Sequence, residues 1–248
     1  MKTVMILGGA KGVGKEILKS CIEKGYNVAF SGRQGALGTE IINSLNAKDR
    51  LYFHELDLNS INQIEAFYLE TIKRFKRIDS LIIYAGITPV SSILETDEDL
   101  YDSVFNINLK APFFLIKHVL KSMISQKSGS IVFFGSAHMD CGHIDRTAYA
   151  LTKNSLYTLS NHIARHYAKF GVRSNYLVMG WTNTEGELEL RTKEGIDEKE
   201  LHEKAASVVP MGRMLNPYDP VPAVMYFISD QSIMTTGSLM RVTGGEYI

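Results

Sequence analysis

Seven short runs of apolar and β-branched residues alternate with longer segments of helical periodicity, from the third residue of the chain almost to its end. Apolar runs of about four to eight residues are typical of strands that are buried on both faces. Strands that alternate with helices form parallel sheets, with the helices as crossovers. We therefore expect an α/β fold with a doubly wound sheet of seven mostly parallel strands and helices on both faces. The expected strands are 3–7, 27–31, 51–55, 79–84, 130–135, 172–179 and 239–242.

The composition does not break this pattern, so we expect residues 1–248 to form a single domain. Hydrophobic residues make up 45% of the chain and charged residues 22%, which excludes a mainly disordered protein. The 27 basic and 27 acidic residues balance, so the chain has no net field that would attract nucleic acid. No apolar run approaches the roughly 18 residues of a membrane span. We expect a complete, cytoplasmic protein with no nucleic-acid or membrane partner.

The two cysteines give no sign of a metal site or a disulfide. Cys21 and Cys141 lie 120 residues apart, without the paired spacing of a zinc site or of a secreted disulfide framework. We expect a reducing compartment and no bound metal.

Residues 181–210 form the longest stretch without a strand signal, and they are rich in Glu and Lys. The stretch contains a helical pattern at 197–207 and lies between the last two expected strands. Long insertions at this place in an α/β sheet often cover a substrate, so we expect a substrate lid at about 181–210. A solvated surface excursion explains the composition equally well.

A glycine-rich turn follows the first expected strand and precedes a helical pattern. Its glycines are Gly8, Gly9, Gly12 and Gly14. Glycines at such a turn let the backbone approach a pyrophosphate and direct the first amides of the helix toward its charge. The spacing of Gly8, Gly12 and Gly14 differs from the GxGxxG pattern, so the turn alone is a weak indication of a dinucleotide site.

The same turn also resembles a phosphate-binding P-loop. Gly9, Gly14 and Lys15 match that pattern up to its last position, where Ser or Thr binds magnesium. Glu16 stands at that position, and no apolar strand ending in Asp follows downstream. Both departures argue against an ATPase or GTPase. A tight turn without any ligand is the remaining alternative.

Gly32 and Arg33 follow the second expected strand, where a dinucleotide-binding fold contacts the adenosine ribose. An acidic residue there would accept the 2′-hydroxyl of NAD, whereas an Arg without a neighbouring acid suits the 2′-phosphate of NADP. Lys11 would add a second positive charge close to this phosphate. We therefore expect NADP(H) rather than NAD(H). Two ordinary surface cations are the alternative interpretation.

Tyr149 and Lys153 are four apart in a helical pattern, so they share one helix face. Ser136 ends the expected strand before them, and Asn108 lies in the helical segment 105–119. Interconversion of a carbonyl and an alcohol needs an acid/base on the oxygen that titrates near pH 7. Tyrosine has a pKa of about 10, and a nearby ammonium favours the phenolate. The pattern predicts Tyr149 as the acid/base, with a pKa lowered by Lys153.

Taken together, these residues resemble the short-chain dehydrogenase/reductase family along essentially the whole chain. The tetrad of the family is matched by Asn108, Ser136, Tyr149 and Lys153, and its motif TGxxxGxG by Gly8, Gly12 and Gly14. The resemblance implies a Rossmann-type fold and an NADP-dependent oxidoreductase. The similar branches are the 3-oxoacyl carrier-protein reductases and the sugar dehydrogenases.

The resemblance also implies a role for each matched residue. Lys153 would hold the nicotinamide ribose, Ser136 would bind the substrate oxygen, and Asn108 would support a water that leads to Lys153. The remaining positions that it places at the cofactor are Lys11, Val13, Arg33, Asp57, Leu58, Ala85, Gly86, Gly180, Thr182 and Thr184.

Three positions depart from the family pattern: Leu7 replaces the motif Thr, Ile83 and Tyr84 replace its Asn-Asn pair, and Met179 replaces a Pro. In the family, the Thr and one Asn connect the first and fourth strands through polar contacts. Both sides are apolar or aromatic here, so we expect the replacements to be coupled, with packing in place of a buried polar link. Tyr84 also changes the expected shape of the adenosine site.

By the resemblance, residues 137–147 line the substrate side of the nicotinamide, and several of them are charged or titratable. We therefore expect a small polar carbonyl or alcohol as substrate. His138, His143 and Trp181 are the candidate substrate contacts, although Trp181 would serve equally as an anchor for the excursion.

Apolar residues on 105–119 and on the helix that carries Tyr149 exceed what one sheet face needs. This surplus fits the assembly of the family into homodimers or homotetramers through these two helices. A protein that binds NADP(H) without turnover, as a sensor or scaffold, is the alternative function. The complete tetrad argues against it, because a binding protein has no need of the phenol and the ammonium together.

Overall fold

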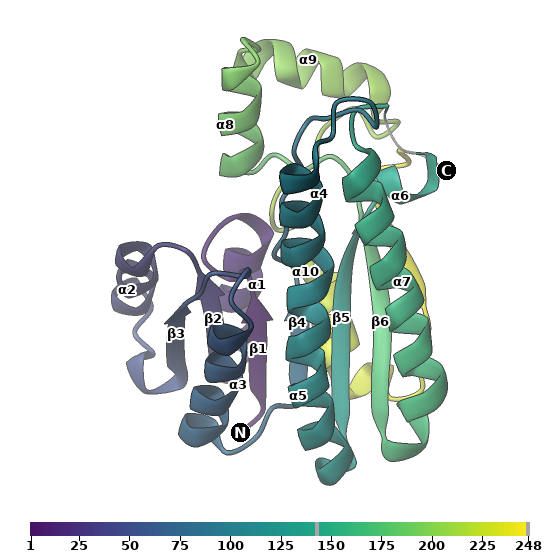
Figure 1. Ribbon diagram of the computed structural model, residues 1–248. Helices are drawn as coiled ribbons and strands as arrows, with labels where there is room; N and C mark the ends of the chain where they lie inside the picture. Colours follow the sequence, from purple (N-terminus) through teal and green to yellow (C-terminus); the bar gives the residue numbers. More distant parts are fainter. Residues whose placement is uncertain (142–143, 247–248) are drawn as a thin grey trace.

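The computed structural model describes residues 1–141 and 144–246, and its strands form one seven-stranded sheet in the order β3-β2-β1-β4-β5-β6-β7 (Figure 1). Every neighbouring pair is parallel. The predicted doubly wound α/β class is confirmed, and each predicted strand end agrees to within one residue. The strands are β1 Thr3–Leu7, β2 Asn27–Gly32, β3 Leu51–Glu55, β4 Ser80–Ile83, β5 Gly129–Ser136, β6 Val172–Met179 and β7 Leu239–Val242.

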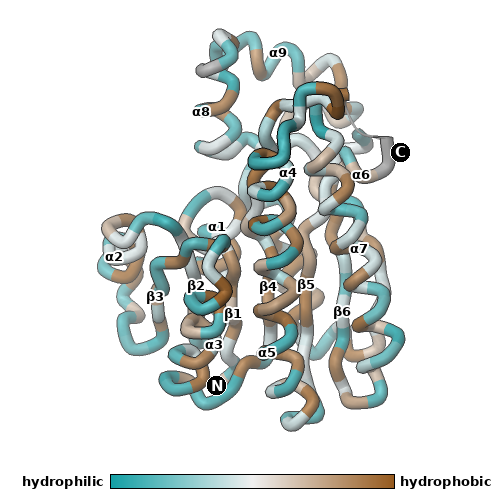
Figure 2. Tube along the Cα trace, viewed as in Figure 1, coloured by the Kyte–Doolittle hydropathy of each residue, from teal (hydrophilic) through white to brown (hydrophobic). Residues whose placement is uncertain are grey.

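Helices cover both faces of the sheet, which is why the central strands carry apolar residues on both sides (Figure 2). One face is covered by α3 Ile61–Phe75, α5 Ala111–Gln126 and α7 Thr147–Tyr167. The other face is covered by α1 Gly12–Glu23, α2 Gly35–Ser44 and α10 Val221–Ile228. The shorter helices are α4 Glu98–Phe105, α6 His138–Cys141, α8 Glu185–Lys193 and α9 Glu198–Val208.

The strand order reverses between β1 and β4, which lie side by side although β2 and β3 separate them in the chain. In parallel α/β sheets, ligands bind beyond the carboxyl ends of the strands at this point of reversal. The glycine-rich turn follows β1 at this place, and Ala85 follows β4. The fold therefore places the predicted dinucleotide site at the expected edge of the sheet.

The excursion 181–210 is helical and has a small core of its own. It contains α8 and α9, which stand beyond the carboxyl ends of the central strands (Figure 1). Leu201 and Ala205 of α9 pack with Met214, and Trp181 lies against the same cluster. The predicted helical piece 197–207 corresponds to α9. Within the described part of the chain, no helix is long and apolar enough to cross a membrane.

The structure explains the departure at Leu7. Leu7 and Ile83 are register neighbours in β1 and β4, both are buried, and both belong to the core under α3, α5 and α7. Tyr84 lies on the opposite face, where its ring packs edge-on against Phe134 with centroids 5.1 Å apart. The apolar pair Leu7–Ile83 therefore takes the place of the polar link, and Tyr84 belongs to another part of the core.

We expect Leu7→Thr to destabilise the protein by about 1–3 kcal/mol relative to Leu7→Val, because Thr and Val have nearly the same shape and only the Thr hydroxyl is buried opposite an apolar side chain. Urea denaturation of both variants and of the parent protein measures the difference. A Thr variant as stable as the Val variant would contradict the packing argument.

Candidate active site

The glycine turn is built so that α1 starts directly against the end of β1. Gly8 and Gly12 have φ angles of +94° and +53°, which side chains rarely allow. A Cβ on Gly14 would lie 2.1 Å from the carbonyl oxygen of Gly8, so only glycine permits this approach. Lys11 precedes the helix and makes no side-chain cap. The first turn of α1 therefore faces the carboxyl edge of the sheet without the usual capping side chain.

Tyr84 reaches this turn from the end of β4. Its hydroxyl accepts a hydrogen bond from the backbone N–H of Val13, and burial raises the pKa of the hydroxyl to about 12 despite this bond. A Cβ on Gly12 would lie 3.1 Å from the Tyr84 hydroxyl and 3.2 Å from the Thr184 methyl group. Tyr84 thus shapes the site at the glycine turn, where a pyrophosphate would lie, rather than at the adenosine end.

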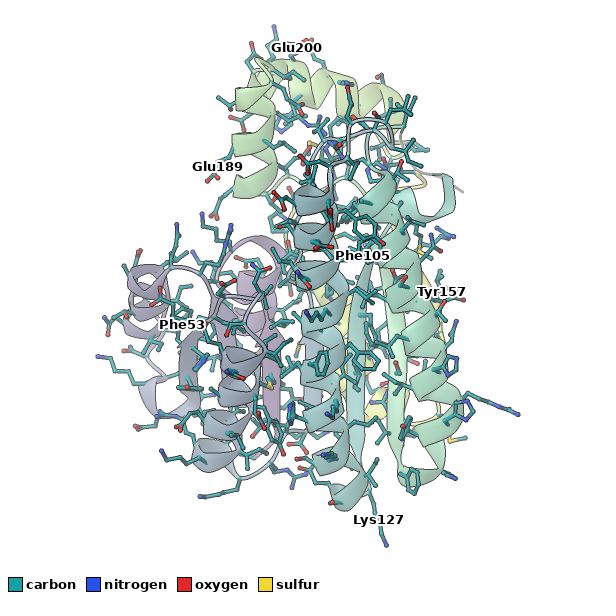
Figure 3. The ribbon with its side chains drawn as sticks, viewed as in Figure 1. Phe53, Phe105, Lys127, Tyr157, Glu189 and Glu200 are labelled. Atoms are coloured by element: carbon teal, nitrogen blue, oxygen red, sulfur yellow. The ribbon has the colours of Figure 1, made fainter. Side chains whose placement is uncertain are left out.

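The two predicted phosphate-binding cations lie near the glycine turn and differ in their contacts. Arg33 is exposed just beyond β2 and has no ion-pair partner among residues 1–141 and 144–246. Lys11 Nζ lies 3.8 Å from Glu189 Oε1, and both side chains are about half exposed. Glu189 lies on α8 (Figure 3). Such a contact is weak in water. Both cations are therefore accessible to a phosphate group.

Two further predicted cofactor residues follow β3. Asp57 is exposed, and its Oδ1 accepts hydrogen bonds of 3.0 Å from the backbone and side-chain nitrogens of Asn59. Leu58 is partly buried against the core.

Asn108 lies in a π-helical turn, Asn106–Lys110, between α4 and α5, where a continuous helix was predicted. Its side chain is fully buried, accepts from the Ile87 N–H at 2.8 Å and donates to the Ile87 carbonyl at 2.8 Å. It also donates to Thr152 Oγ1 on α7 at 3.3 Å. A Cβ on Gly86 would lie 3.1 Å from Asn108 Oδ1 and 3.8 Å from Lys153 Nζ. Asn108 therefore ties the segment after β4 to the helix that carries Tyr149.

Ser136, Tyr149 and Lys153 come together at the carboxyl end of β5. The Ser136 hydroxyl accepts from the backbone N–H of His138 at 3.2 Å and hydrogen-bonds the Tyr149 hydroxyl. Lys153 Nζ lies over the Tyr149 ring, 5.5 Å from its centre, and donates to the Phe134 carbonyl at 2.9 Å. The ring of His138 meets that of Tyr149 edge-on, with centroids 6.3 Å apart.

The electrostatics of this cluster differ from the prediction. Burial raises the pKa of the Tyr149 hydroxyl, while the Ser136 hydrogen bond and the Arg146 guanidinium lower it and Glu187 raises it. Burial also lowers the pKa of the Lys153 ammonium to about 8. The predicted lowering of the Tyr149 pKa by Lys153 does not occur in this structure, because desolvation of the phenolate outweighs the favourable groups and Lys153 is not among them.

Two charged residues act on Tyr149. Arg146 belongs to the predicted substrate-side segment 137–147 but was not connected with Tyr149, and Glu187 was missed. Arg146 immediately precedes α7 and is only 6% exposed. Glu187 lies on α8, so its approach to Tyr149 depends on how the excursion folds. The position of Arg146, three residues before Tyr149, could have indicated its effect from the sequence. No local pattern indicated that of Glu187.

The segment after β6 holds α8 over the site. Thr182 is buried and donates to the Gly180 carbonyl at 2.9 Å, and Thr184 caps α8 by accepting from the Glu187 N–H at 3.2 Å. The Trp181 indole donates to Glu187 Oε1 at 2.6 Å. Trp181 thus acts as an anchor for the excursion, and its contact with substrate stays a prediction. His143 lies outside the described residues.

Comparisons with known proteins agree with this arrangement. A family profile described as short chain dehydrogenase matches residues 2–195. A Thermotoga maritima protein, described as an uncharacterized oxidoreductase, is 31% identical over 248 residues, which are 99% of this chain and 97% of the relative.

Two solved structures share the fold. Actinorhodin polyketide ketoreductase with NADPH has a TM-score of 0.93 at 22% identity, over 99% of this chain and 97% of that chain. The 3-ketoacyl-(acyl-carrier-protein) reductase of Brucella melitensis, complexed with NADH, has a TM-score of 0.90 at 20% identity, over 100% and 98%. With a family profile over most of its length and a relative above 30% identity, the chain belongs to the short-chain dehydrogenase/reductase family of oxidoreductases.

Proposed function

We propose that the protein interconverts a ketone and a secondary alcohol on a small polar substrate with NADP(H), and that Tyr149 is the general acid/base. The observation that carries this proposal is the hydrogen bond between Ser136 and Tyr149, one helical turn from Lys153. This cluster lies at the same edge of the sheet as the glycine turn, to which Gly86 and Asn108 connect it. A group that exchanges a proton and a turn that admits a pyrophosphate are the two requirements of this chemistry.

The residues present fit a nicotinamide dinucleotide. Gly8, Gly12 and Gly14 leave the first turn of α1 free of side chains, as a pyrophosphate requires. Lys153 would hold the nicotinamide ribose, and Asp57, Leu58, Ala85, Gly180, Thr182 and Thr184 would complete the cradle. The bound nicotinamide supplies a hydride for reduction and takes it up in oxidation.

Tyr149 moves the proton in this proposal. Because its pKa is raised, the phenol is neutral at pH 7 and can donate to the oxygen of a ketone held by the Ser136 hydroxyl. The proton is then replaced from solvent. In the reverse direction the phenolate accepts the alcohol proton, so alcohol oxidation gains rate as the pH rises toward the Tyr149 pKa.

Removal of the hydroxyl tests the acid/base role. We expect Tyr149→Phe to lower kcat for ketone reduction by about 100- to 10,000-fold, because general acid catalysis contributes that much. NADPH affinity, followed by nicotinamide fluorescence, should change by less than about threefold, since only the hydroxyl is lost.

Tyr157→Phe is the matched control, because Tyr157 lies on the same helix and its ring packs against Tyr176, not against Ser136 or Tyr149. Equal activity of Tyr149→Phe and Tyr157→Phe would overturn the assignment. NADPH binding by the parent protein without turnover of any carbonyl or alcohol would favour the sensor or scaffold alternative.

The preference for NADP(H) rests on Arg33, with Lys11 in support. Arg33 is exposed beyond β2 without an ion-pair partner in residues 1–141 or 144–246, so its guanidinium is available to a 2′-phosphate. The acid nearest to Arg33 in the sheet is Glu55 of β3, which is the register partner of Gly32. Its carboxylate lies against the start of α2, because a Cβ on Gly35 would be 2.6 Å from it.

We expect Arg33→Gln to raise the Kd for NADPH about 10- to 100-fold and to change the Kd for NADH by less than about threefold, because a charge-assisted hydrogen bond contributes about 1.5–3 kcal/mol. Paired fluorescence titrations with the two cofactors measure both constants. A parent protein that prefers NADH would contradict the NADP assignment and leave the tetrad unaffected.

We further propose that α8 and α9 form the substrate lid and that the chain assembles as a homodimer or homotetramer through α5 and α7. A groove of about 1140 Å³ runs between these two helices and is largely apolar. Phe113 on its rim is 50% exposed, which is unusual for phenylalanine.

A second copy of the same two helices would cover this groove. We expect light scattering to give at least twice the 27.8 kDa of one chain. Phe113→Glu should shift the mass toward the monomer, whereas Leu69→Glu, on the exposed side of α3, should not. A monomeric parent protein would contradict this proposal.

A further inference from the structure

Arg146 is a buried cation whose hydrogen-bonding capacity the protein uses only in part. Its side chain is 6% exposed. Nη1 donates to the Asp145 carbonyl at 3.1 Å and lies 3.5 Å from Asp145 Oδ2, whose side chain is 41% exposed. Nε and Nη2 make no hydrogen bond to any residue whose side chain the structure describes, a set that leaves out 140–143. A guanidinium has five donors, and its burial with so few partners is unfavourable unless something else binds it.

The position of Arg146 is fixed by the backbone on both sides. Arg146 forms an isolated parallel bridge with Ser91, in the segment that follows β4, and the Ser91 N–H donates to the Asp145 carbonyl at 2.9 Å. The Arg146 carbonyl accepts from the Ala150 N–H at 2.9 Å, as the first bond of α7. The backbone of Arg146 is therefore held on both sides, by the segment around Ser91 and by the first turn of α7.

Arg146 immediately precedes α7 and lies three residues before Tyr149, so its side chain starts about one helical turn from that of Tyr149. The guanidinium is one of the groups that lower the pKa of the Tyr149 hydroxyl. The other charge that acts on this hydroxyl is Glu187, whose Oε1 is already bound by the Trp181 indole and by Arg191 Nε at 2.7 Å.

We propose that Arg146 binds a carboxylate of the substrate, so that the protein acts on a short oxo acid and the corresponding hydroxy acid. The inference rests on the proposed function and names the substrate class of the same site. A guanidinium pairs with a carboxylate through two parallel hydrogen bonds, for which Nε and Nη2 are free within the described structure. A spacing on the order of one helical turn places this carboxylate within a few bonds of the carbonyl that Ser136 and Tyr149 hold.

Charged and uncharged substrates of the same shape test this proposal. Acetoacetate and its methyl ester carry the same ketone, and so do pyruvate and methyl pyruvate, but only the acids offer a carboxylate. We expect kcat/KM of the parent protein to be at least 10-fold higher for one of the acids than for its ester, because a charge-assisted hydrogen bond is about twice as strong as a neutral one.

Three variants assign that preference to Arg146. Because Arg146 also acts on the Tyr149 hydroxyl, Arg146→Met should slow both substrates. It should lower kcat/KM at least 10-fold more for the preferred acid than for the ester, since only the acid loses a carboxylate contact. Arg146→Lys retains the positive charge but not the planar guanidinium, so its kcat/KM for the acid should fall less than that of Arg146→Met. Arg165→Met, on the exposed side of α7, is the control, and its kcat/KM for the acid and for the ester should equal those of the parent protein. Thermal unfolding of each variant shows whether it is folded.

The outcomes separate this inference from the proposed function. If the parent protein reduces the esters as well as the acids, or if Arg146→Met slows acid and ester equally, the carboxylate site is wrong and the oxidoreductase assignment stands. If the parent protein reduces none of these ketones, calorimetric titration of the NADPH-loaded protein with acetoacetate and with its ester still decides. Tighter binding of the acid that Arg146→Met abolishes supports the site, and equal or absent binding overturns it.

Discussion

The approach of α1 to the end of β1 is the constraint on which the rest of the site depends. Gly14 packs against the Gly8 carbonyl at a distance that excludes any side chain, and a Cβ on Gly8 would lie 2.8 Å from the backbone nitrogen of Ala85. Three segments, the ends of β1 and β4 and the start of α1, therefore meet without side chains between them. This contact fixes the glycine turn relative to the segment after β4. Asn108 connects that segment to α7, because its side chain hydrogen-bonds both Ile87 and Thr152.

Much of this arrangement could be predicted from the sequence, for a physical reason. A parallel sheet covered on both faces needs strands that are apolar throughout, so each strand appears as an uninterrupted run, as Thr3–Leu7 does with all five residues buried. The tetrad could be found through the resemblance to the family, once these runs had located the strand and the helices that carry its members. Ser136 closes β5, and Tyr149 and Lys153 lie one turn apart on the next long helix.

The electrostatic character of the site could not be predicted in the same way. The pKa of Tyr149 depends on its burial and on Glu187, which reaches the site only because Trp181 and Arg191 hold it on α8. In the sequence Arg146 is one of several charged residues of the substrate-side segment 137–147, and its burial follows only from the pairing with the segment around Ser91. The pKa of Tyr149 and the environment of Arg146 are both determined by burial and by residues distant in the chain. A local sequence pattern carries no information on either.

The π-helical turn that holds Asn108 has a geometric consequence for the helices on either side. Each residue of an α-helix turns the chain by about 100°, and a π-helical turn accommodates roughly one extra residue. The turn therefore rotates every side chain of α5 by about that angle relative to the phase set by α4. Deletion of a single residue there would restore one continuous helical phase, and the face that α5 presents to α7 and to solvent would change along its whole length.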